Sequence, residues 1–154
     1  MVSFIQMSEA QFDMFSLSTM RDYARNRVLC GDWAAGNAED KAHSLFSKIL
    51  PYGRNTEGHH FHVLFEADLE RNIGELWFAV DFPEKSAFIY AINIYPEFRR
   101  LGCAKKAIQH LETMGPELGF TKISLNVFSH NRPAQALYSG LGFFPKSMEM
   151  AKSF

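Results

Sequence analysis

The fold of this chain is decided by the stretch Ile92–Lys106, which reads INIYPEFRRLGCAKK. An apolar strand leads through Pro96 into a turn, and the turn leads into a helix. The first residues of this helix include Gly102 and Ala104, so no bulky side chain covers the backbone there. The first N–H groups of a helix lack an intrahelical acceptor and carry the positive end of the helix dipole. The stretch therefore predicts an anion site, and phosphate is the commonest ligand of such a terminus.

Basic side chains gather around the same turn, at Arg99, Arg100, Lys105 and Lys106. The whole protein has 16 Lys and Arg residues against 17 Asp and Glu, a formal net charge of -1, and its pI is near 6.6. A solvated basic loop with a helix cap would account for the charge alone. The small residues in register with the arginines favour a phosphate site, and the overall balance argues against a nucleic-acid partner.

Length and composition are those of an ordinary globular protein. The chain has 154 residues, of which 47% are hydrophobic and 21% charged, and this predicts one domain over residues 1–154. Its two cysteines, Cys30 and Cys103, form no secretory framework. No apolar run approaches the ~20 residues of a membrane-spanning helix, and the first residues do not resemble a signal peptide. We therefore expect a soluble, cytoplasmic protein with no membrane partner.

Outward from this stretch, apolar periodicity predicts the other elements. Ser8 and Gln11 have capping-box spacing, which predicts a first helix running towards Leu29. Period-two alternation indicates strands in the middle of the chain. The expected order is strand 2–6, helix 8–29, a helix from Asn37 to Pro51, strands 60–67, 75–82 and 87–94, the helix after the basic turn, strand 122–128, helix 132–141 and a final strand or hairpin 143–152. This is an α/β domain with a largely antiparallel first half.

Three other signatures of phosphate binding or hydrolysis are missing from the sequence. There is no GxxxxGKS or GxxxxGKT segment, which argues against a P-loop kinase or ATPase. No GxGxxG follows an early strand, which argues against a dinucleotide-binding domain. GxSxG is missing as well, and with it the usual nucleophile elbow of a hydrolase.

Two motifs stand on this order of elements, Arg99-x-x-Gly102-x-Ala104 and the segment Asn131–Phe143, which reads NRPAQALYSGLGF. They resemble the Gln/Arg-x-x-Gly-x-Gly/Ala motif and the later NxxAxxLYxxxGF pattern of the GNAT superfamily of N-acetyltransferases. The chain is especially similar to small uncharacterised bacterial members that share a GxW segment, here Gly31–Trp33, and a histidine-rich second strand. The resemblance implies the GNAT fold, a mixed central sheet of about six to seven strands flanked by about four helices.

For the donor, the resemblance implies acetyl-CoA as cosubstrate, bound between the fourth and fifth strands, and no metal. The main chain of Ile92, Asn93 and Ile94 would pair with its pantetheine arm as an added strand does. Asn131 matches a family position whose side chain contacts the same arm. Arg100 stands where many members carry glycine. The N–H groups expected around the diphosphate are those of Arg99, Arg100, Leu101, Gly102, Cys103, Ala104 and Lys105.

For the chemistry, the resemblance implies attack of a neutral amine on the thioester, with a backbone N–H near Ile94 polarising the carbonyl. Tyr138 matches the tyrosine that protonates the leaving thiolate in many members, although it could instead be a packing residue of an amphipathic helix. Strand 87–94 holds no carboxylate, where several members carry the general base. The candidates for the base are Glu66, His62, Glu75 and a water chain.

Three histidines, one cysteine and three aromatic residues could each have a more specific role. His60 and His62 would share a strand face and suggest zinc, but no third ligand has a recognisable spacing, so a structural or pocket role is favoured for them and for His59. Cys103 could be a nucleophile at a helix start, yet a small residue tolerated in the turn explains it more simply. The residues expected either on the acceptor side or in the core are Trp33, Tyr52 and Phe61.

Two functions from different classes follow. The first is an acetyl-CoA-dependent N-acetyltransferase that acts on a primary amine of a small molecule or peptide. The second is a non-catalytic acyl-CoA-binding or sensing module with the same fold. Tyr138 favours the enzyme, and the missing carboxylate on the fourth strand leaves room for the sensor. The acceptor, the acyl-chain preference and the oligomeric state are not readable from the sequence; dimers are common in the family, so a homodimer is compatible with it.

Overall fold

A computed structural model describes the whole chain, residues 1–154. Its element order follows the predicted order up to the last helix. None of the helices combines the length and the apolar character that a membrane crossing requires. The strands and α-helices are β1 (Val2–Gln6), α1 (Glu9–Leu29), α2 (Ala38–Ile49), β2 (His59–Glu66), β3 (Arg71–Asp81), β4 (Ser86–Ile94), α3 (Cys103–Leu118), β5 (Lys122–Leu125) and α4 (Arg132–Gly140).

Helix α1 begins where the capping box predicts. The Gln11 N–H donates to Ser8 Oγ at 3.2 Å, and the Ser8 N–H donates to Gln11 Oε1 at 2.9 Å. The helix ends at Leu29, and Gly31 follows with a φ of 87°, in the left-handed region that favours glycine. Both ends of the longest helix are thus set by local sequence.

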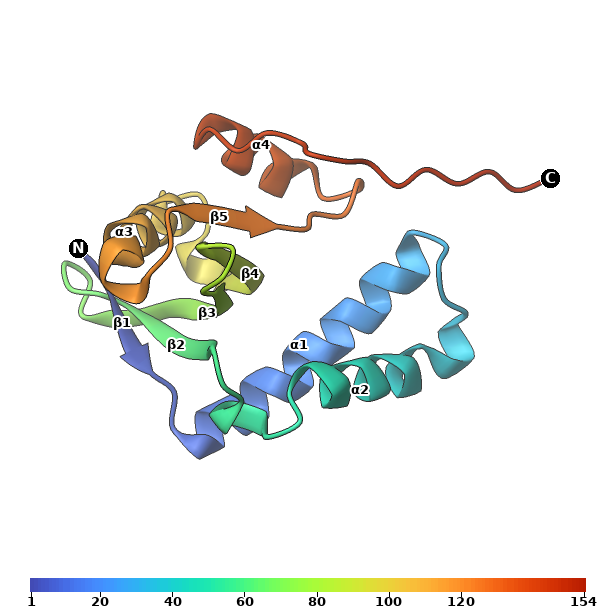
Figure 1. The fold of residues 1–154 in the computed structure, drawn as a ribbon, viewed down its shortest axis with the longest axis horizontal. Coiled ribbons are helices and arrows are strands. Elements are labelled where there is room, and N and C mark those ends of the chain that lie inside the picture. The colour runs from blue at the N-terminus through green and yellow to red at the C-terminus, as the bar shows by residue number, and fades with distance from the viewer.

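The strands form one mixed sheet in the order β1-β2-β3-β4-β5. The first four are antiparallel neighbours, and β5 runs parallel to β4. Figure 1 shows α1 and α2 on one side of the sheet, α3 on the other, and α4 beyond β5. The core beneath α3 includes Leu76 and Phe78, and the core on the α1–α2 face includes Phe15, Phe61 and Trp77.

Strands β4 and β5 pair only over their first four residues, Ser86–Ile89 opposite Lys122–Leu125. On the other side of β4, Ile89 lies opposite Phe78 and Ala91 lies opposite Trp77, so Tyr90 is an extra residue in the ladder. Such a bulge bends the strand and increases its twist. The rest of β4, beyond Ile89, therefore turns away from β5 and has a free edge.

The prediction of six to seven strands is wrong for this chain, because the sheet has five. Segment 143–152, predicted as a final strand or hairpin, is extended but unpaired. Figure 1 shows it leaving α4 and ending well clear of the other elements. Strand β5 is also shorter than the predicted 122–128. Alternating apolar residues give a segment the apolar face that a buried strand needs. A strand must also pair with the edge of a neighbouring strand, and the sequence pattern does not show whether such an edge is available.

Candidate active site

The free edge of β4 presents the main chain of two of the three residues predicted to bind the pantetheine arm. The Tyr95 N–H donates to a carbonyl of β3 at 2.9 Å. Because the backbone alternates with period two, the main chain of Asn93 also points towards β3, and that of Ile92 and Ile94 points to the free edge. Gly74 of β3 agrees with this, since a Cβ added there would collide with the Asn93 carbonyl. The main-chain role predicted for Asn93 is therefore not matched by its orientation.

After β4 and the short turn of residues 95–99, six consecutive N–H groups, Arg100–Lys105, donate to no acceptor in the chain. The Arg99 N–H differs from them, because it donates to the Pro96 carbonyl at 3.3 Å within the turn. The row ends at Lys106, whose N–H donates to the Gly102 carbonyl at 3.0 Å. Of the predicted diphosphate-binding set, all but Arg99 thus have a free N–H group.

Two residues of this row have a left-handed backbone, Arg100 with a φ of 63° and Gly102 with a φ of 77°. A left-handed residue next to a right-handed one turns successive N–H groups towards one side, which is the geometry of an anion-binding nest, and Gly102 followed by the first residue of α3 is such a pair. Glycine adopts this region freely, whereas a residue with a Cβ is strained by roughly 1–2 kcal/mol. Arg100 therefore holds a conformation that favours glycine.

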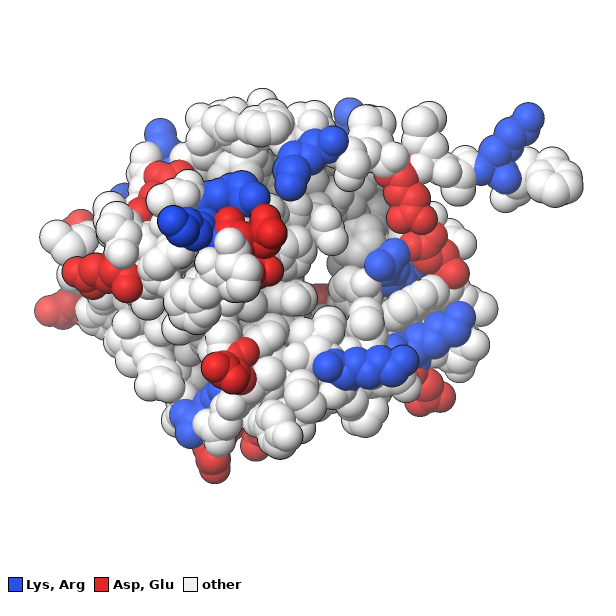
Figure 2. Space-filling view, in the orientation of Figure 1, with Lys and Arg blue, Asp and Glu red and all other residues white.

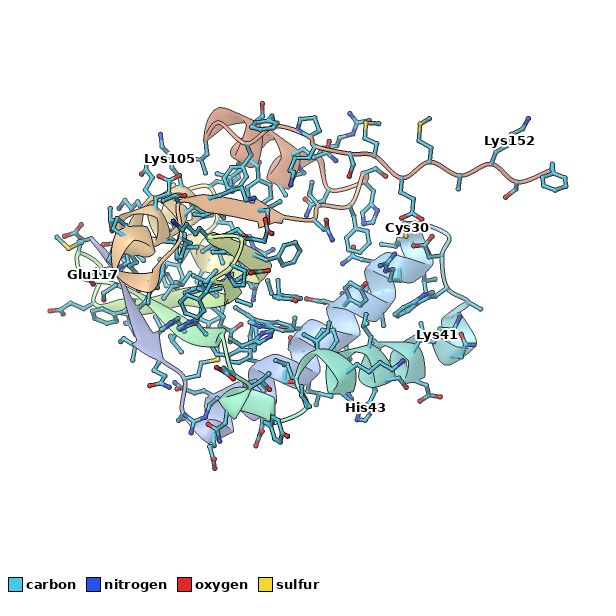
Figure 3. The ribbon with its side chains drawn as sticks, viewed as in Figure 1. Cys30, Lys41, His43, Lys105, Glu117 and Lys152 are labelled. Carbon is cyan, nitrogen blue, oxygen red and sulfur yellow. The ribbon has the colours of Figure 1, made fainter.

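The four basic side chains of the turn divide into bound and free ones. Arg99 Nε donates to the last carbonyl of β4 at 2.8 Å and fastens the turn to the strand. Lys106 Nζ lies 2.9 Å from Glu66 Oε2. Arg100 and Lys105 are exposed and have no ion pair, and Figure 3 shows Lys105 projecting from α3 into solvent. Two cations are thus free beside the row of N–H groups.

The other side chains of the row leave its N–H groups uncovered. Leu101 is 59% exposed, whereas Cys103 is 3% exposed and packs into the core beneath α3 together with the partly buried Ala104. The sequence offered a nucleophile or a small residue tolerated in the turn, and the structure places Cys103 in the core, with its thiol turned away from the N–H groups.

Helix α4 carries the second motif. Asn131 Oδ1 accepts a hydrogen bond from the Ala134 N–H at 3.3 Å and caps the helix, so its side-chain amide N–H groups are free. Tyr138 is half-buried, with its ring centroid 5.5 Å from that of Phe143. Burial raises the pKa of Tyr138 above its ordinary value, which keeps its hydroxyl protonated at neutral pH.

Glu66, the first of the three candidate bases, is committed to holding the structure together. Its side chain is 1% exposed and accepts hydrogen bonds from the amino group of Met1 and from Lys106. These bonds, that of Met1 foremost, lower the pKa of Glu66 to about 2. A carboxylate held in this way is a weak base, and it ties β1, β2 and α3 together.

His62 lies on the α3 face of the sheet, with its ring centroid 5.5 Å from that of Phe4 and 5.9 Å from that of Phe78. Both ring nitrogens are buried without a hydrogen-bond partner. Burial lowers the pKa of His62 to about 4. His59 lies on the opposite face, where it accepts a hydrogen bond from Trp77 Nε1 at 2.9 Å. No three His, Cys, Asp or Glu side chains come together as a metal site.

Glu75 of β3 lies on the α1–α2 face, between Val63 and Asn93 of the neighbouring strands. Its carboxylate accepts hydrogen bonds from the Tyr95 hydroxyl at 3.3 Å and from Asn93 Nδ2 at 3.4 Å. Burial, helped by the charge of Glu75, raises the pKa of Tyr95 to about 12, so Tyr95 stays a donor. Among the three candidates, Glu75 is the one beside the free end of β4.

Sequence reasoning did not single out the side chains of Asn93 and Tyr95. A signal for them was present, because residues 93 and 95 alternate onto one strand face at the end of a strand that leads into the phosphate turn. Assigning that face to Glu75 requires the register between β3 and β4, which the sequence does not give. The cluster of Glu75, Asn93 and Tyr95 can therefore be recognised only from the pairing of β3 with β4.

The aromatic residues expected on the acceptor side are scattered. Phe61 is 3% exposed and belongs to the core, whereas Tyr52 is 76% exposed on the surface. Trp33 is half-buried beside Arg27, whose guanidinium carbon lies 5.7 Å from the Trp33 ring centroid. The interpretation as core residues holds for Phe61, and Trp33 belongs to a small aromatic cluster at the end of α1 that also contains Tyr23.

The end of α1 also reaches the segment after β5. The Arg27 guanidinium carbon lies 5.9 Å from the centroid of Phe128, and Asn26 Oδ1 lies 2.7 Å from His130 Nε2. Figure 2 shows the molecule hollowed between this contact and the sheet, with acidic and basic side chains interspersed around the opening. The hollow lies on the side of the sheet that Glu75 faces.

Comparison with known proteins assigns this arrangement to a class. The family model described as acetyltransferase (GNAT) family matches residues 18–143. The uncharacterised N-acetyltransferase YdgE of Bacillus subtilis (strain 168) is 32% identical over 148 residues, which are 95% of this chain and 94% of YdgE. YycN of the same organism is 33% identical over 150 residues, with the same coverage of 95% and 94%. The chain belongs to the GNAT family and is an N-acetyltransferase.

Solved structures agree with this assignment. The crystal structure of YycN has a TM-score of 0.94 and 30% identity, and the match covers 100% of this chain and 99% of that chain. AAC(6')-Iy, in complex with the bisubstrate analogue CoA-S-monomethyl-acetylneamine, has a TM-score of 0.56 and 17% identity, with coverage of 100% and 98%. At this lower identity the likeness concerns the fold alone.

Proposed function

We propose that this enzyme transfers the acetyl group of acetyl-CoA to a primary amine by direct attack of the amine on the thioester. The observation that carries the proposal is the row of free N–H groups, Arg100–Lys105, next to the free edge of β4. A helix start with free N–H groups favours a diphosphate, and a free strand edge favours an extended arm with amide groups. Coenzyme A carries both features in one molecule.

In this proposal the donor is held at three points. The row Arg100–Lys105 binds the diphosphate, and the free cations of Arg100 and Lys105 add charge beside it. The main chain of Ile92 and Ile94 pairs with the pantetheine arm. The free amide of Asn131 contacts the arm from the α4 side.

The transfer itself needs a polarised carbonyl and a proton for the leaving group. The amine nitrogen forms a bond to the thioester carbon, and the carbon–sulfur bond breaks. The Ile94 N–H, on the free edge, stabilises the charge that develops on the carbonyl oxygen. Tyr138 gives its hydroxyl proton to the leaving thiolate, which its raised pKa supports because the donor form dominates.

Glu75 is the base that we propose for the amine proton, which it takes directly or through one water. Three observations support it: the face of the sheet it lies on, its closeness to the end of β4, and its two hydrogen bonds, with Tyr95 and Asn93. Glu66 is held by two cations, and His62 lies on the other face of the sheet. The acceptor amine would then enter from the hollow beside α1 (Figure 2).

Two measurements on the wild-type protein test the proposal. Calorimetric titration with CoA should give heat with one site per chain. Thioester consumption with a panel of polyamines, amino acids, peptides and aminoglycosides should exceed hydrolysis for at least one amine. Absence of heat with CoA would overturn the donor site. Heat without turnover on any amine would make the chain an acyl-CoA sensor.

A charge reversal beside the free N–H groups of Arg100–Lys105 tests whether this turn binds the donor. Lys105→Glu should weaken CoA binding at least tenfold, because it replaces a free cation beside the N–H row with an anion. Its fold should be kept, since Lys105 is exposed and an acidic residue is favoured in the first turn of a helix. Lys48→Glu, the same change at an exposed position of α2, is the control and should leave the calorimetric affinity unchanged. Equal affinities of the two variants would argue against the turn.

A further inference from the structure

A polar cavity lies at the corner of the sheet where β1 ends and the chain continues into α1 (Figure 1). The last residue of β1, Gln6, pairs with His62, so the first three residues of β2 extend beyond β1. Arg54, in the short turn Gly53–Asn55 before β2, reaches this corner and donates from Nη1 to the Met7 carbonyl at 2.7 Å. The cavity has a volume of about 190 Å³, and its lining residues are Gln6, Arg54, His59, His60, Phe61 and His62.

Three buried nitrogen atoms of the lining side chains have no hydrogen-bond partner, namely Arg54 Nε and both ring nitrogens of His62. Burial lowers the pKa of His62 to about 4, so at neutral pH one ring nitrogen carries a proton and the other does not. Either tautomer leaves a buried N–H group without an acceptor. Because an unbonded buried donor destabilises a fold, these atoms indicate a ligand that accepts hydrogen bonds.

The two other histidines of the lining add further donors. Trp77 Nε1 donates to His59 Nδ1 at 2.9 Å, which places the proton of a neutral His59 ring on Nε2. His60 lies beside His62 on the same strand face, with the two ring centroids 6.2 Å apart, and a neutral His60 ring also carries one N–H group. The N–H groups of the cavity thus come from β2 and from the turn before it.

The charge of the lining is positive, because Arg54 belongs to it and no carboxylate does. Arg54 Nη2 lies 3.8 Å from Glu9 Oε1, but the Glu9 side chain is 79% exposed, so solvent weakens this pair. A guanidinium group offers its N–H groups in a fixed fork that matches the oxygens of phosphate. The volume exceeds that of a single ordered water, whose share of liquid volume is about 30 Å³. Charge, donors and size together favour a small oxyanion with several oxygens.

We propose that this cavity binds a phosphate group, either as free phosphate or as the phosphate monoester of a small molecule, with Arg54 and His62 as its main donors. The site is separate from the donor site, because none of its lining residues belongs to β4, to α3 or to the turn between them. A bound phosphate would join β1, β2 and the turn Gly53–Asn55 where α1 begins. Its binding does not depend on acetyl transfer.

Nuclear magnetic resonance of the histidine rings tests the site on the full chain. Titration with inorganic phosphate and with methyl phosphate, in Tris at constant neutral pH and ionic strength, should shift the ring signals of His60 and His62 in a saturable way. The signal of His43, at an exposed position of α2, should stay in place. The tighter of the two ligands identifies the source of the phosphate group. Shifts that fail to saturate, or that chloride reproduces, would mean that the cavity holds water alone and would overturn the proposal.

Two variants separate the cavity from its surroundings. His62→Phe keeps an aromatic ring between Phe4 and Phe78 and removes both nitrogens, so the phosphate affinity, followed on the His60 signal, should fall at least tenfold. The matched control is His110→Phe, whose ring also lies against Phe4, at 4.7 Å between centroids, but does not line the cavity; its affinity should be unchanged. Equal phosphate affinities of the two variants would contradict the assignment.

Arg54→Gln tests the charge of the cavity and should also weaken phosphate binding at least tenfold. Because Arg54 holds the Met7 carbonyl as well, urea unfolding without phosphate shows whether the variant is folded. Phosphate should then raise the urea midpoint of the wild type and leave that of His62→Phe unchanged. Calorimetric titration of His62→Phe with CoA should match the wild type, so a failure of this site and a failure of the donor site are told apart.

Discussion

Arg100 has the left-handed backbone that arginine disfavours, and it has it within the row of free N–H groups. Strain of this kind persists where the surrounding structure fixes the backbone, and it gathers at binding sites. Here the neighbours that fix it are the Arg99 side chain, bonded to the end of β4, and Gly102, with its own positive φ. In our proposal the turn therefore has its anion-binding shape before the anion binds.

Replacing Arg100 separates its strain from its charge. Arg100→Gly should be more stable than Arg100→Ala by about 1 kcal/mol, because glycine alone is free of the left-handed penalty. Both variants lose the same cation and should weaken CoA binding alike, by a few-fold. Urea unfolding and calorimetry measure the two effects. Equal stability of the two variants would show that the backbone strain is absent in solution.

Tyr138 tests the acid role at the same scale. Tyr138→Phe keeps the ring beside Phe143 and removes the hydroxyl, so kcat should fall at least tenfold while the affinity for CoA stays within a factor of two. Steady-state kinetics with the best amine of the panel, together with CoA titration, measure both. An unchanged kcat would remove Tyr138 from the chemistry.

At the scale of elements, the course of β4 organises the site. The extra residue Tyr90 falls directly after the last pair with β5, so bending of β4 and loss of pairing coincide. Across the sheet, Gly74 lets β3 approach the Asn93 carbonyl closely. The bulge at Tyr90 separates one edge of β4 from β5, and Gly74 allows the other edge to pack closely against β3.

A side chain at Gly74 should therefore disturb the site through the strand. In Gly74→Ala the new Cβ would collide with the Asn93 carbonyl, so β4 must move away from β3. We expect a loss of about 2 kcal/mol in the free energy of unfolding, and a lower kcat because Glu75 and Ile94 shift with the strands. Gly36→Ala is the control, since an added Cβ there meets nothing within 4 Å. Urea unfolding and kinetics compare the two, and a Gly74→Ala protein as active as its control would contradict this account.

Local signals in the sequence predicted the helices and strands well, but they did not predict which strands pair with each other. The capping box of Ser8 and Gln11 and the motif around Gly102 each act within a few residues, and both are confirmed as a helix start. The missing sixth strand and the orientation of Asn93 depend on which edge a strand meets. The choice among Glu66, His62 and Glu75 likewise depends on sheet faces and on distant partners such as Met1 and Lys106.

At the scale of the whole molecule, buried titratable groups on the α3 side link stability to pH. The folded state holds His62 at a pKa of about 4, against an ordinary value of 6.5. As pH falls below 6.5, the unfolded chain takes up the proton first, so stability falls until about pH 4 and then levels off for this group. Glu66, held at about 2 against an ordinary 4.5, contributes stability that is lost below pH 4.5. The two groups thus act in successive windows.

The variant His62→Phe should remove the pH dependence of stability that His62 causes between pH 6.5 and pH 4. The wild type should lose up to about 3 kcal/mol between pH 6.5 and pH 4 through His62, with His60 on the same face adding to the loss because burial lowers its pKa as well. In His62→Phe most of this slope should disappear, and the loss below pH 4.5 should remain. His43→Phe, at an exposed position of α2, is the control. Urea unfolding at half-unit pH steps measures the curves, and identical slopes above pH 4.5 in all three proteins would refute the assignment.

The hydrogen bond from Arg99 Nε to the Ile94 carbonyl joins the turn rigidly to the strand. In the proposed donor site this bond holds two groups at a set separation, the free N–H groups that would bind the diphosphate and the Ile94 N–H. A donor contacts both groups when its acyl carbon and its phosphates are separated by the length of one pantetheine arm. Acetylcysteamine, which lacks the phosphates, would contact only one of these groups and forgo the binding energy that positions the reacting carbon.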